Sequence, residues 1–291
     1  MSKITISVDS TADLGEERFK QYGFEVIAIG VVIDGVVRRD YFDVKQEDIY
    51  KAVEVDKLSP KTNAALEIDY KELFEKATAD GGSIIHFSVS GKLSLSHANA
   101  LAASKDMERV YVIDSKSNSV GTGLHAIKVK EILDDENVKK LLASGKKTLS
   151  DIAKEAQEMA EKIDAGFIIN DLKYLHRGGR VTGLKLLGAN LLKIRPSLHM
   201  ISDGTLMPGR KFKGDFALAC REYTKHRLEQ LPDVDKSLAI VVHSAIEEKI
   251  VDTMIDDLKS AGFKEIIRTQ AGAGITVHCG RNMLGLAVMN F

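Results

Sequence analysis

The sequence predicts an α/β protein of two domains, and three observations support this prediction. Its 291 residues are enough for about two domains of ordinary size. In the first half, short apolar runs alternate with amphipathic helical patterns, which is typical of a parallel sheet with helices on both faces. In the second half, hairpin signals are mixed with helical patterns, which indicates a mixed sheet. We therefore expect an N-terminal three-layer α/β/α domain over residues 1–164 and a C-terminal two-layer α/β domain over 165–291.

The elements of the first domain follow from apolar spacing and turn residues. Strands are expected at 3–8, 24–33, 83–89 and 109–114, with Asp34-Gly35 as a tight hairpin turn after the second strand. Helices are expected at 43–55, 66–79 and 149–163, the first of them with Asp43 and Gln46 at capping-box spacing. The polar turn Asp9–Asp13 follows the first strand and is interpreted as a helix cap.

The second domain is expected to combine five strands, a hairpin and three helices. The strands are predicted at 166–170, 238–243, 264–269, 275–278 and 284–290. The hairpin pairs 197–201 with 205–208 around the turn Asp203-Gly204. The helices are predicted at 184–192, 214–230 and 247–261.

The formal net charge of −1 hides two opposed regions. The segment 173–213 has nine basic residues and one acidic residue, whereas the rest of the chain has 32 basic and 41 acidic residues. A near-neutral total argues against a protein that coats nucleic acid as a polycation. The basic segment is interrupted by Gly178-Gly179 and Pro196 and has few aromatic residues, so support for base stacking is poor. Docking of an acidic protein partner is the better use of this segment.

The sequence has no clear signal for a membrane span, for secretion or for a metal site. The longest apolar run, 26–33, is far shorter than the roughly 20 residues that cross a bilayer, and we expect no membrane insertion. The start of the chain shows no apolar core of a signal peptide, and two isolated cysteines suggest reduced thiols, so a cytoplasmic location is expected. The eight histidines lack metal-ligand spacing, and no metal is expected.

One glycine-containing motif could be either a cofactor-binding loop or the start of a helix. The stretch Gly121–Ala126 matches the dinucleotide-binding pattern, but six residues separate it from the preceding strand. We interpret it as a helix start that contains glycines, and no cofactor is expected. His86 lies within a strand pattern and is interpreted as a core histidine.

Polar side chains lie in three loops at the ends of expected strands, where open α/β sheets bind ligands. They are Thr62 in the first loop, Ser90, Ser94 and Ser96 in the second, and His278 in the third. Judged by spacing alone, each is an ordinary turn residue. Together with further motifs they carry a family resemblance.

The motifs occur in a fixed order along nearly the whole chain. They are Asp9–Leu14 after the first strand, a loop with Pro60 and Thr62, Leu93-Ser94 before a helix, Val112–Ser115 with Ser119 and Gly121, Leu172–Arg180, Leu192–Pro196 running to Asp203-Gly204, and His278 with Gly280 and Gly285. In this order the chain resembles the DegV-like family, the fatty-acid-binding subunits of bacterial fatty acid kinase.

The resemblance implies a lipid-binding carrier and not an enzyme. It implies that a long-chain fatty acid binds between two α/β domains and that Thr62, Ser94 and His278 bind its carboxylate. It also implies that a separate ATP-binding kinase subunit phosphorylates the presented carboxylate to an acyl phosphate for phospholipid synthesis. Arg180 and Lys213 match family positions in the basic surface that docks this kinase, and Arg210 lies in the same segment. The predicted helix 184–192 would form a wall of the acyl tunnel.

The chain departs from the family pattern beside each anchor. The family has Thr-Ser-x-Pro-Ser, Leu-Ser-Gly-Thr-Tyr and His-Thr-Gly-Pro-Gly where this chain has 62–66, 93–97 and 278–282. The last change introduces Arg281, and we expect it to add a positive charge near the ligand's head group. A similar fold serves the substrate-binding part of dihydroxyacetone kinases, which hold a small ketone on a histidine, so a small carbonyl ligand is the alternative.

Overall fold

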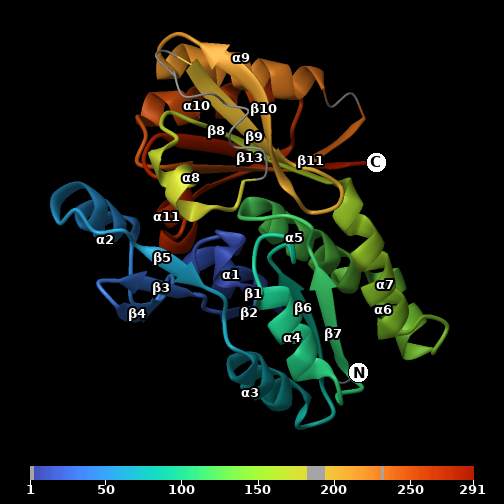
Figure 1. Cartoon of the computed structure of the whole chain (residues 1–291). Helices are drawn as coiled ribbons and strands as arrows, with labels where there is room; N and C mark the ends of the chain where they lie inside the picture. Colours follow the sequence, from blue (N-terminus) through green and yellow to red (C-terminus); the bar gives the residue numbers. More distant parts are fainter. Residues whose placement is uncertain (1–2, 182–193, 231–232) are drawn as a thin grey trace.

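The computed structural model describes residues 3–181, 194–230 and 233–291, and it contains two large sheets and one small one (Figure 1). A four-stranded sheet of order β2-β1-β6-β7 lies in the first half. Its strands are β1 Ile4–Asp9, β2 Phe24–Ile27, β6 Ser83–Ser88 and β7 Val110–Asp114. All neighbouring strands pair in parallel. The prediction of a parallel sheet in the first half is therefore confirmed.

Helices cover both faces of this sheet. On one face, α3 (Glu67–Thr78) and α4 (Ser96–Ser104) bury Tyr70, Phe74 and Ala100 against Ile84. On the other face lie α5 (Val120–Asp134) and α7 (Leu149–Met159), with α6 (Glu136–Ala143) between them in sequence. The short α1 (Glu16–Tyr22) leads from β1 into β2.

A six-stranded sheet of order β10-β9-β8-β13-β11-β12 lies in the second half. The strands are β8 Ile163–Ile169, β9 Ile194–Met200, β10 Leu206–Lys213, β11 Val234–Ser244, β12 Glu265–Gln270 and β13 Met283–Asn290. Only β11 and β12 pair in parallel, so the expected mixed sheet is confirmed. Helices α9 (Phe216–Glu229) and α10 (Glu248–Ser260) cover the face that points away from the four-stranded sheet (Figure 1).

Helix α5 lies between the two large sheets and contacts strands of both. Its first ten residues, 120–129, are all buried, as expected for a helix that is surrounded by protein. The glycines of the motif Gly121–Ala126 lie in its first turns, as interpreted from the sequence. A Cβ on Gly123 would lie 2.7 Å from the carbonyl oxygen of Ala12, so glycine permits the close packing of α5 on the segment after β1.

The predicted strand 24–33 is confirmed at 24–27 and 30–33 but is wrong as a single strand, because the chain changes sheet within it. Strand β2 ends at Ile27, and β3 (Gly30–Ile33) belongs to a three-stranded antiparallel sheet with β4 (Val36–Arg39) and β5 (Lys61–Asn63). The break has a side-chain cause. The hydroxyl of Ser10 accepts the backbone N–H of Ile29 at 3.2 Å, which replaces a strand partner. The hairpin turn at Asp34-Gly35 is confirmed by the pairing of β3 with β4.

The predicted strand 275–278 is also wrong. These residues form most of helix α11 (Ala273–Cys279), although isoleucine, threonine and valine favour strands. The N–H groups of Gly272 and Gly274, at the start of this helix, donate to the buried carboxylates of Asp13 and Asp40 at 2.7 and 2.9 Å. These two hydrogen bonds satisfy N–H groups that have no partner within the helix, so distant residues override the local preference.

Two predicted helix caps are wrong as well. Helix α2 (Gln46–Tyr50) begins after Lys45, whose N–H donates to Asp48 at 2.9 Å, while Asp43 pairs with Arg39. The expected helix 43–55 continues from α2 as a π-helical turn over 51–55. The Asp9–Asp13 turn does not cap α1, whose N-cap is Gly15.

His86 is a buried core histidine, as interpreted from the sequence, and its Nδ1 shares a 2.9 Å hydrogen bond with Ser7, whereas its Nε2 has no hydrogen-bond partner among the described residues. The hairpin at Asp203-Gly204 joins β9 to β10. The predicted helix 184–192 lies outside the described residues, and the domain limit at 164 stays a prediction. Among the residues described, no helix has the length and apolar character to cross a bilayer, and no three metal-ligating side chains cluster.

Candidate functional site

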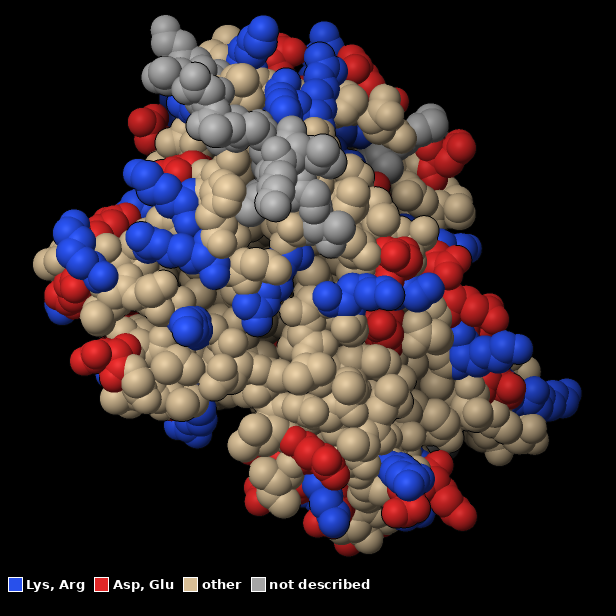
Figure 2. Space-filling view, viewed as in Figure 1, with Lys and Arg blue, Asp and Glu red and all other residues tan. Residues whose placement is uncertain are grey.

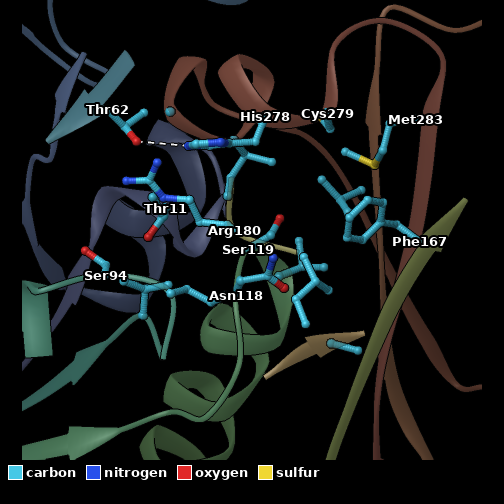
Figure 3. A pocket seen from close by; sticks show the side chains of 18 of the residues that line it. Thr11, Thr62, Ser94, Asn118, Ser119, Phe167, Arg180, His278, Cys279 and Met283 are labelled. Atoms are coloured by element: carbon cyan, nitrogen blue, oxygen red, sulfur yellow. Dashed lines mark hydrogen bonds between the residues drawn. The ribbon is translucent and has the colours of Figure 1, made fainter. Parts of the chain in front are cut away.

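A pocket opens between the two large sheets and is lined by both halves of the chain (Figure 3). The space between its walls is about 960 Å³ when the open solvent at its mouth is counted with it. From the four-stranded sheet come the loops that follow β1, β6 and β7, which are the carboxyl ends of three neighbouring parallel strands. Open α/β sheets bind ligands at this edge. We call this cavity the central pocket.

Polar side chains gather at one side of the central pocket. Figure 3 shows Thr62, Arg180, Thr11 and Ser94 on this side, with His278 beside Thr62. They come from different elements: Thr62 from β5, Ser94 from the loop between β6 and α4, and His278 from the last turn of α11. The three sequence-predicted anchors therefore line the same pocket.

Thr62 and His278 are in direct contact. The Thr62 Oγ1 and His278 Nε2 atoms lie 2.9 Å apart and share a hydrogen bond, although the residues are 216 positions apart in sequence. The other ring nitrogen, Nδ1, is buried and has no hydrogen-bond partner among the described residues. Helix α8 (Lys173–Gly178) packs against this ring, and a Cβ on Gly178 would lie only 2.2 Å from Nδ1. Glycine at 178 is thus required for the position of the imidazole.

The His278 imidazole is neutral at physiological pH. Burial lowers its pKa to about 4, and the nearby positive charge of Arg180 acts in the same direction. Arg180 is exposed on the outside yet lines the central pocket, and its Nη1 donates to the carbonyl oxygen of Gly178 at 2.6 Å. A permanent positive charge therefore stands beside a neutral imidazole, which suits an anionic ligand.

Ser94 faces the same space with a different set of partners. Its hydroxyl lies 2.9 Å from the Ser96 hydroxyl and accepts the Ser96 N–H at 3.1 Å. It makes no hydrogen bond to Thr62 or His278, so the structure brings these three residues to one pocket without joining them into one network. Either hydroxyl of the Ser94–Ser96 pair can donate, which leaves Ser94 able to turn its proton towards a ligand.

The other side of the central pocket is apolar. Its walls there are Phe167 from β8, Leu206 from β10, Val242 from β11, and Met283 and Leu286 from β13. Figure 3 shows Phe167 and Met283 across the pocket from Thr62 and Ser94. One cavity thus combines a polar end with an apolar end.

Arg281 does not line the central pocket. Its Nε donates to the Glu54 carboxylate at 2.8 Å, and its guanidinium lies 3.8 Å from the centre of the Tyr50 ring. The positive charge of Arg281 is therefore paired with Glu54, and we leave Arg281 out of the proposed head-group site.

The basic segment is only partly described, because Lys185 and Lys193 lie outside the described residues. Arg210 and Lys213 are exposed on the edge strand β10. Arg210 lies over the Phe212 ring and has its Nη1 3.4 Å from His226 Nδ1. Figure 2 shows Lys and Arg side chains in the upper part of the face where α8 and β10 lie. Arg180 differs from the other two because it also reaches the central pocket.

Sequence reasoning misses several residues of the central pocket. The apolar wall residues Phe167, Met283 and Leu286 carry no motif, because a pocket-facing apolar side chain in a strand is indistinguishable from a core residue. Thr11 falls within the turn interpreted as a helix cap, and its position at the carboxyl end of β1 is the available signal.

Comparisons with known proteins agree in sequence and in fold. A family model described as "Uncharacterised protein, DegV family" matches residues 3–290. A "Fatty acid-binding protein" of Thermotoga maritima is 30% identical, over 98% of this chain and 97% of its own. "Protein DegV" of Bacillus subtilis is 26% identical, over 97% of this chain and 98% of its own.

Solved structures share the whole fold. A DegV lipid-binding protein of Thermotoga maritima superposes with a TM-score of 0.82 at 28% identity and covers 99% of each chain. Another Thermotoga maritima protein, described as revealing a fatty acid binding function, has a TM-score of 0.82 at 27% identity over all of both chains. A Thermus thermophilus DegV family protein, at 24% identity and a TM-score of 0.86 over 99% of this chain and all of its own, supports the fold.

Proposed function

Because the chain belongs to the DegV family, we propose that it binds a long-chain fatty acid in the central pocket as a carrier. The observation that carries this proposal is the division of one pocket into a polar end and an apolar end. The Thermotoga maritima relatives are named for the binding of lipids or fatty acids, not for a reaction. Their ligands support the same class of ligand here.

In this proposal the carboxylate is bound by Thr62, Ser94 and His278. A buried carboxylate is costly unless it is hydrogen-bonded, and two hydroxyls and an imidazole N–H can donate to it. Arg180 adds a positive charge at the same end, and its Nη1 donates to a backbone carbonyl oxygen rather than to a carboxylate. Hydrogen bonds to an ionised acceptor are about twice as strong as neutral ones.

The acyl chain would occupy the apolar end. Phe167, Leu206 and Leu286 present no polar side chain, so the gain on binding comes from apolar surface removed from water, at about 25 cal/mol per Å². A small carbonyl compound, the alternative raised by the dihydroxyacetone kinase fold, would leave this end of the pocket uncovered. The apolar end therefore favours a fatty acid.

We further propose that the bound carboxylate is presented to a separate kinase subunit, which forms an acyl phosphate. Arg180 lines the polar end of the pocket and is also exposed, so it would belong both to the ligand site and to the docking surface. Arg210 and Lys213 would extend this surface along β10. Complementary charge of this kind increases the rate of encounter with an acidic partner.

Mass spectrometry of an organic extract of the purified protein tests the proposal. We expect a fatty acid in the extract, and we expect Ser94→Ala and His278→Ala to weaken binding of oleic acid to the delipidated protein. Leu101→Ala, at an exposed site on α4 outside the pocket lining, is the control and should bind normally. Absence of lipid together with no binding of oleic acid would reject the proposal.

A further inference from the structure

The polar side chains of the Asp9–Asp13 turn are used unequally. Asp9 accepts the Tyr70 hydroxyl at 2.6 Å and the Val89 N–H at 2.8 Å. Ser10 donates to Asp40 at 2.7 Å. Asp13, which binds the start of α11, also accepts the Ser119 hydroxyl. Three of the four polar side chains in this turn therefore hold the fold together.

Thr11 is the exception. Its side chain is 5% exposed, and its hydroxyl is buried with no hydrogen-bond partner among the described residues. The same residue lines the central pocket. Buried hydroxyls are almost always hydrogen-bonded, because an unpaired one loses its hydrogen bonds to water without replacement. A hydroxyl in this state needs an explanation, and a ligand that supplies the missing acceptor is one.

The position of Thr11 supports this explanation. It lies in the short 3-10 helix Ser10–Ala12 that follows β1, and β6, the neighbouring strand, leads into the loop of Ser94. Thr11 and Ser94 thus project from adjacent strand ends. Figure 3 shows Thr11 on the polar side of the pocket, with Ser94 and Arg180 around it.

We propose that Thr11 is a further head-group ligand, whose hydroxyl donates a hydrogen bond to the carboxylate bound in the central pocket. This inference rests on the proposed function. An ionised carboxylate has about four sites that accept hydrogen bonds, so it can use a donor in addition to Thr62, Ser94 and His278. The Thr11 hydroxyl would have a hydrogen-bond partner only when the carboxylate is bound. The free energy of that hydrogen bond would therefore stabilise the complex and not the ligand-free protein.

The pair Thr11→Val and Thr11→Ser tests the proposal. Valine keeps the shape and removes the hydroxyl, whereas serine keeps the hydroxyl. With delipidated protein and oleic acid as the probe, we expect Thr11→Val to weaken binding roughly ten- to one-hundredfold, the loss of one hydrogen bond to a charged group. Thr11→Ser should stay within about threefold of the original protein, since it keeps that hydrogen bond.

Two further measurements separate ligand binding from folding. The ligand-free Thr11→Val protein should be at least as resistant to urea as the original, because it loses a hydroxyl that has no partner. Thr224→Val is the matched control. Its hydroxyl donates to the Cys220 carbonyl in α9, outside the pocket lining, so this change should lower stability and leave oleic acid affinity unchanged.

The outcomes are distinct. Unchanged affinity of Thr11→Val, with Ser94→Ala impaired, would overturn the role of Thr11 and leave the proposed function intact. Weak binding by both Thr11 variants would also overturn it, because the hydroxyl would then not be the cause. If the original protein fails to bind oleic acid, the proposed function itself fails.

Discussion

The carboxylate of Asp13 accepts the backbone N–H of Gly272 at 2.7 Å, across 259 positions of the sequence. Asp40 binds the N–H of Gly274 in the same way, and both carboxylates are buried. Together they fix the first turn of α11, whose last turn carries His278. The segment after β1 therefore positions a pocket residue that lies at the other end of the chain.

Asp13→Asn tests this anchor through pH. Burial raises the pKa of Asp13 well above its usual range, against the lowering effect of hydrogen bonds from Ser119 and Gly272, and nearby Asp40 also raises it. Because the folded-state pKa lies above the unfolded value of about 3.9, the contribution to stability is fully present below pH 4 and is lost as pH rises through the folded-state pKa.

We therefore expect the free energy of unfolding of the original protein, relative to Asp13→Asn, to decrease as pH rises from about 4. Urea unfolding at a series of pH values measures this difference. Asp151→Asn, at an exposed site in the first turn of α7, serves as the control. Hydrogen bonds from Thr148 lower the pKa of Asp151, so for this variant the difference should instead grow with pH. If the difference in unfolding free energy between the original protein and Asp13→Asn instead grew with pH, burial would not be the dominant influence on the pKa of Asp13.

The contact between Asp13 and α11 also shows which parts of the fold can be predicted from sequence. The parallel and mixed sheets are predictable because period and turn residues are local signals. Helix α11 is not, because its formation depends on Asp13 and Asp40, which lie more than 200 positions away. The split of β2 from β3 depends likewise on the Ser10 hydroxyl. Local patterns do not contain such distant contacts.

The candidate site shows the same limit. Thr62, Ser94 and His278 are identified through the family resemblance, and the structure places them on one pocket. Arg281, expected near the head group, lies outside the pocket lining and pairs with Glu54, which is 227 positions away. The unpaired hydroxyl of Thr11 is visible only when all its neighbours are known.

Two adjacent glycines give a matched pair of variants. A Cβ on Gly178 would lie 2.2 Å from His278 Nδ1, so Gly178→Ala should displace the imidazole, break its hydrogen bond to Thr62 and weaken oleic acid binding about tenfold or more. Gly179 has a φ of +65°, and a Cβ added there would meet no atom within 4 Å, so Gly179→Ala should cost about 1–2 kcal/mol of stability and keep its affinity. Titration calorimetry and urea unfolding measure both quantities. Equal binding by the two variants would show that α8 does not set the position of His278.

The titration of His278 should respond to ligand. Its pKa of about 4 follows from burial and from Arg180, and a carboxylate bound beside the ring would stabilise the imidazolium and raise the pKa. NMR of protein labelled in its histidine rings, with and without oleic acid, measures the shift. His125 is the internal control, because burial also lowers its pKa to about 4 but it lies within α5 outside the pocket lining. A ligand that leaves both histidines unchanged would place the carboxylate elsewhere.

Reversal of charge at Lys213 separates partner docking from lipid binding. Lys213 is exposed at the end of edge strand β10 and does not line the central pocket. Lys213→Glu should therefore leave oleic acid affinity unchanged.

In an assay with a bacterial fatty acid kinase subunit and ATP, Lys213→Glu should slow acyl phosphate formation and make its rate less dependent on salt, because charges at the rim of an interface act mainly on the rate of encounter. Lys76→Glu, at an exposed site on α3, carries the same change of net charge away from the basic segment and should keep the original rate. Equal rates for the two variants would exclude β10 from the docking surface.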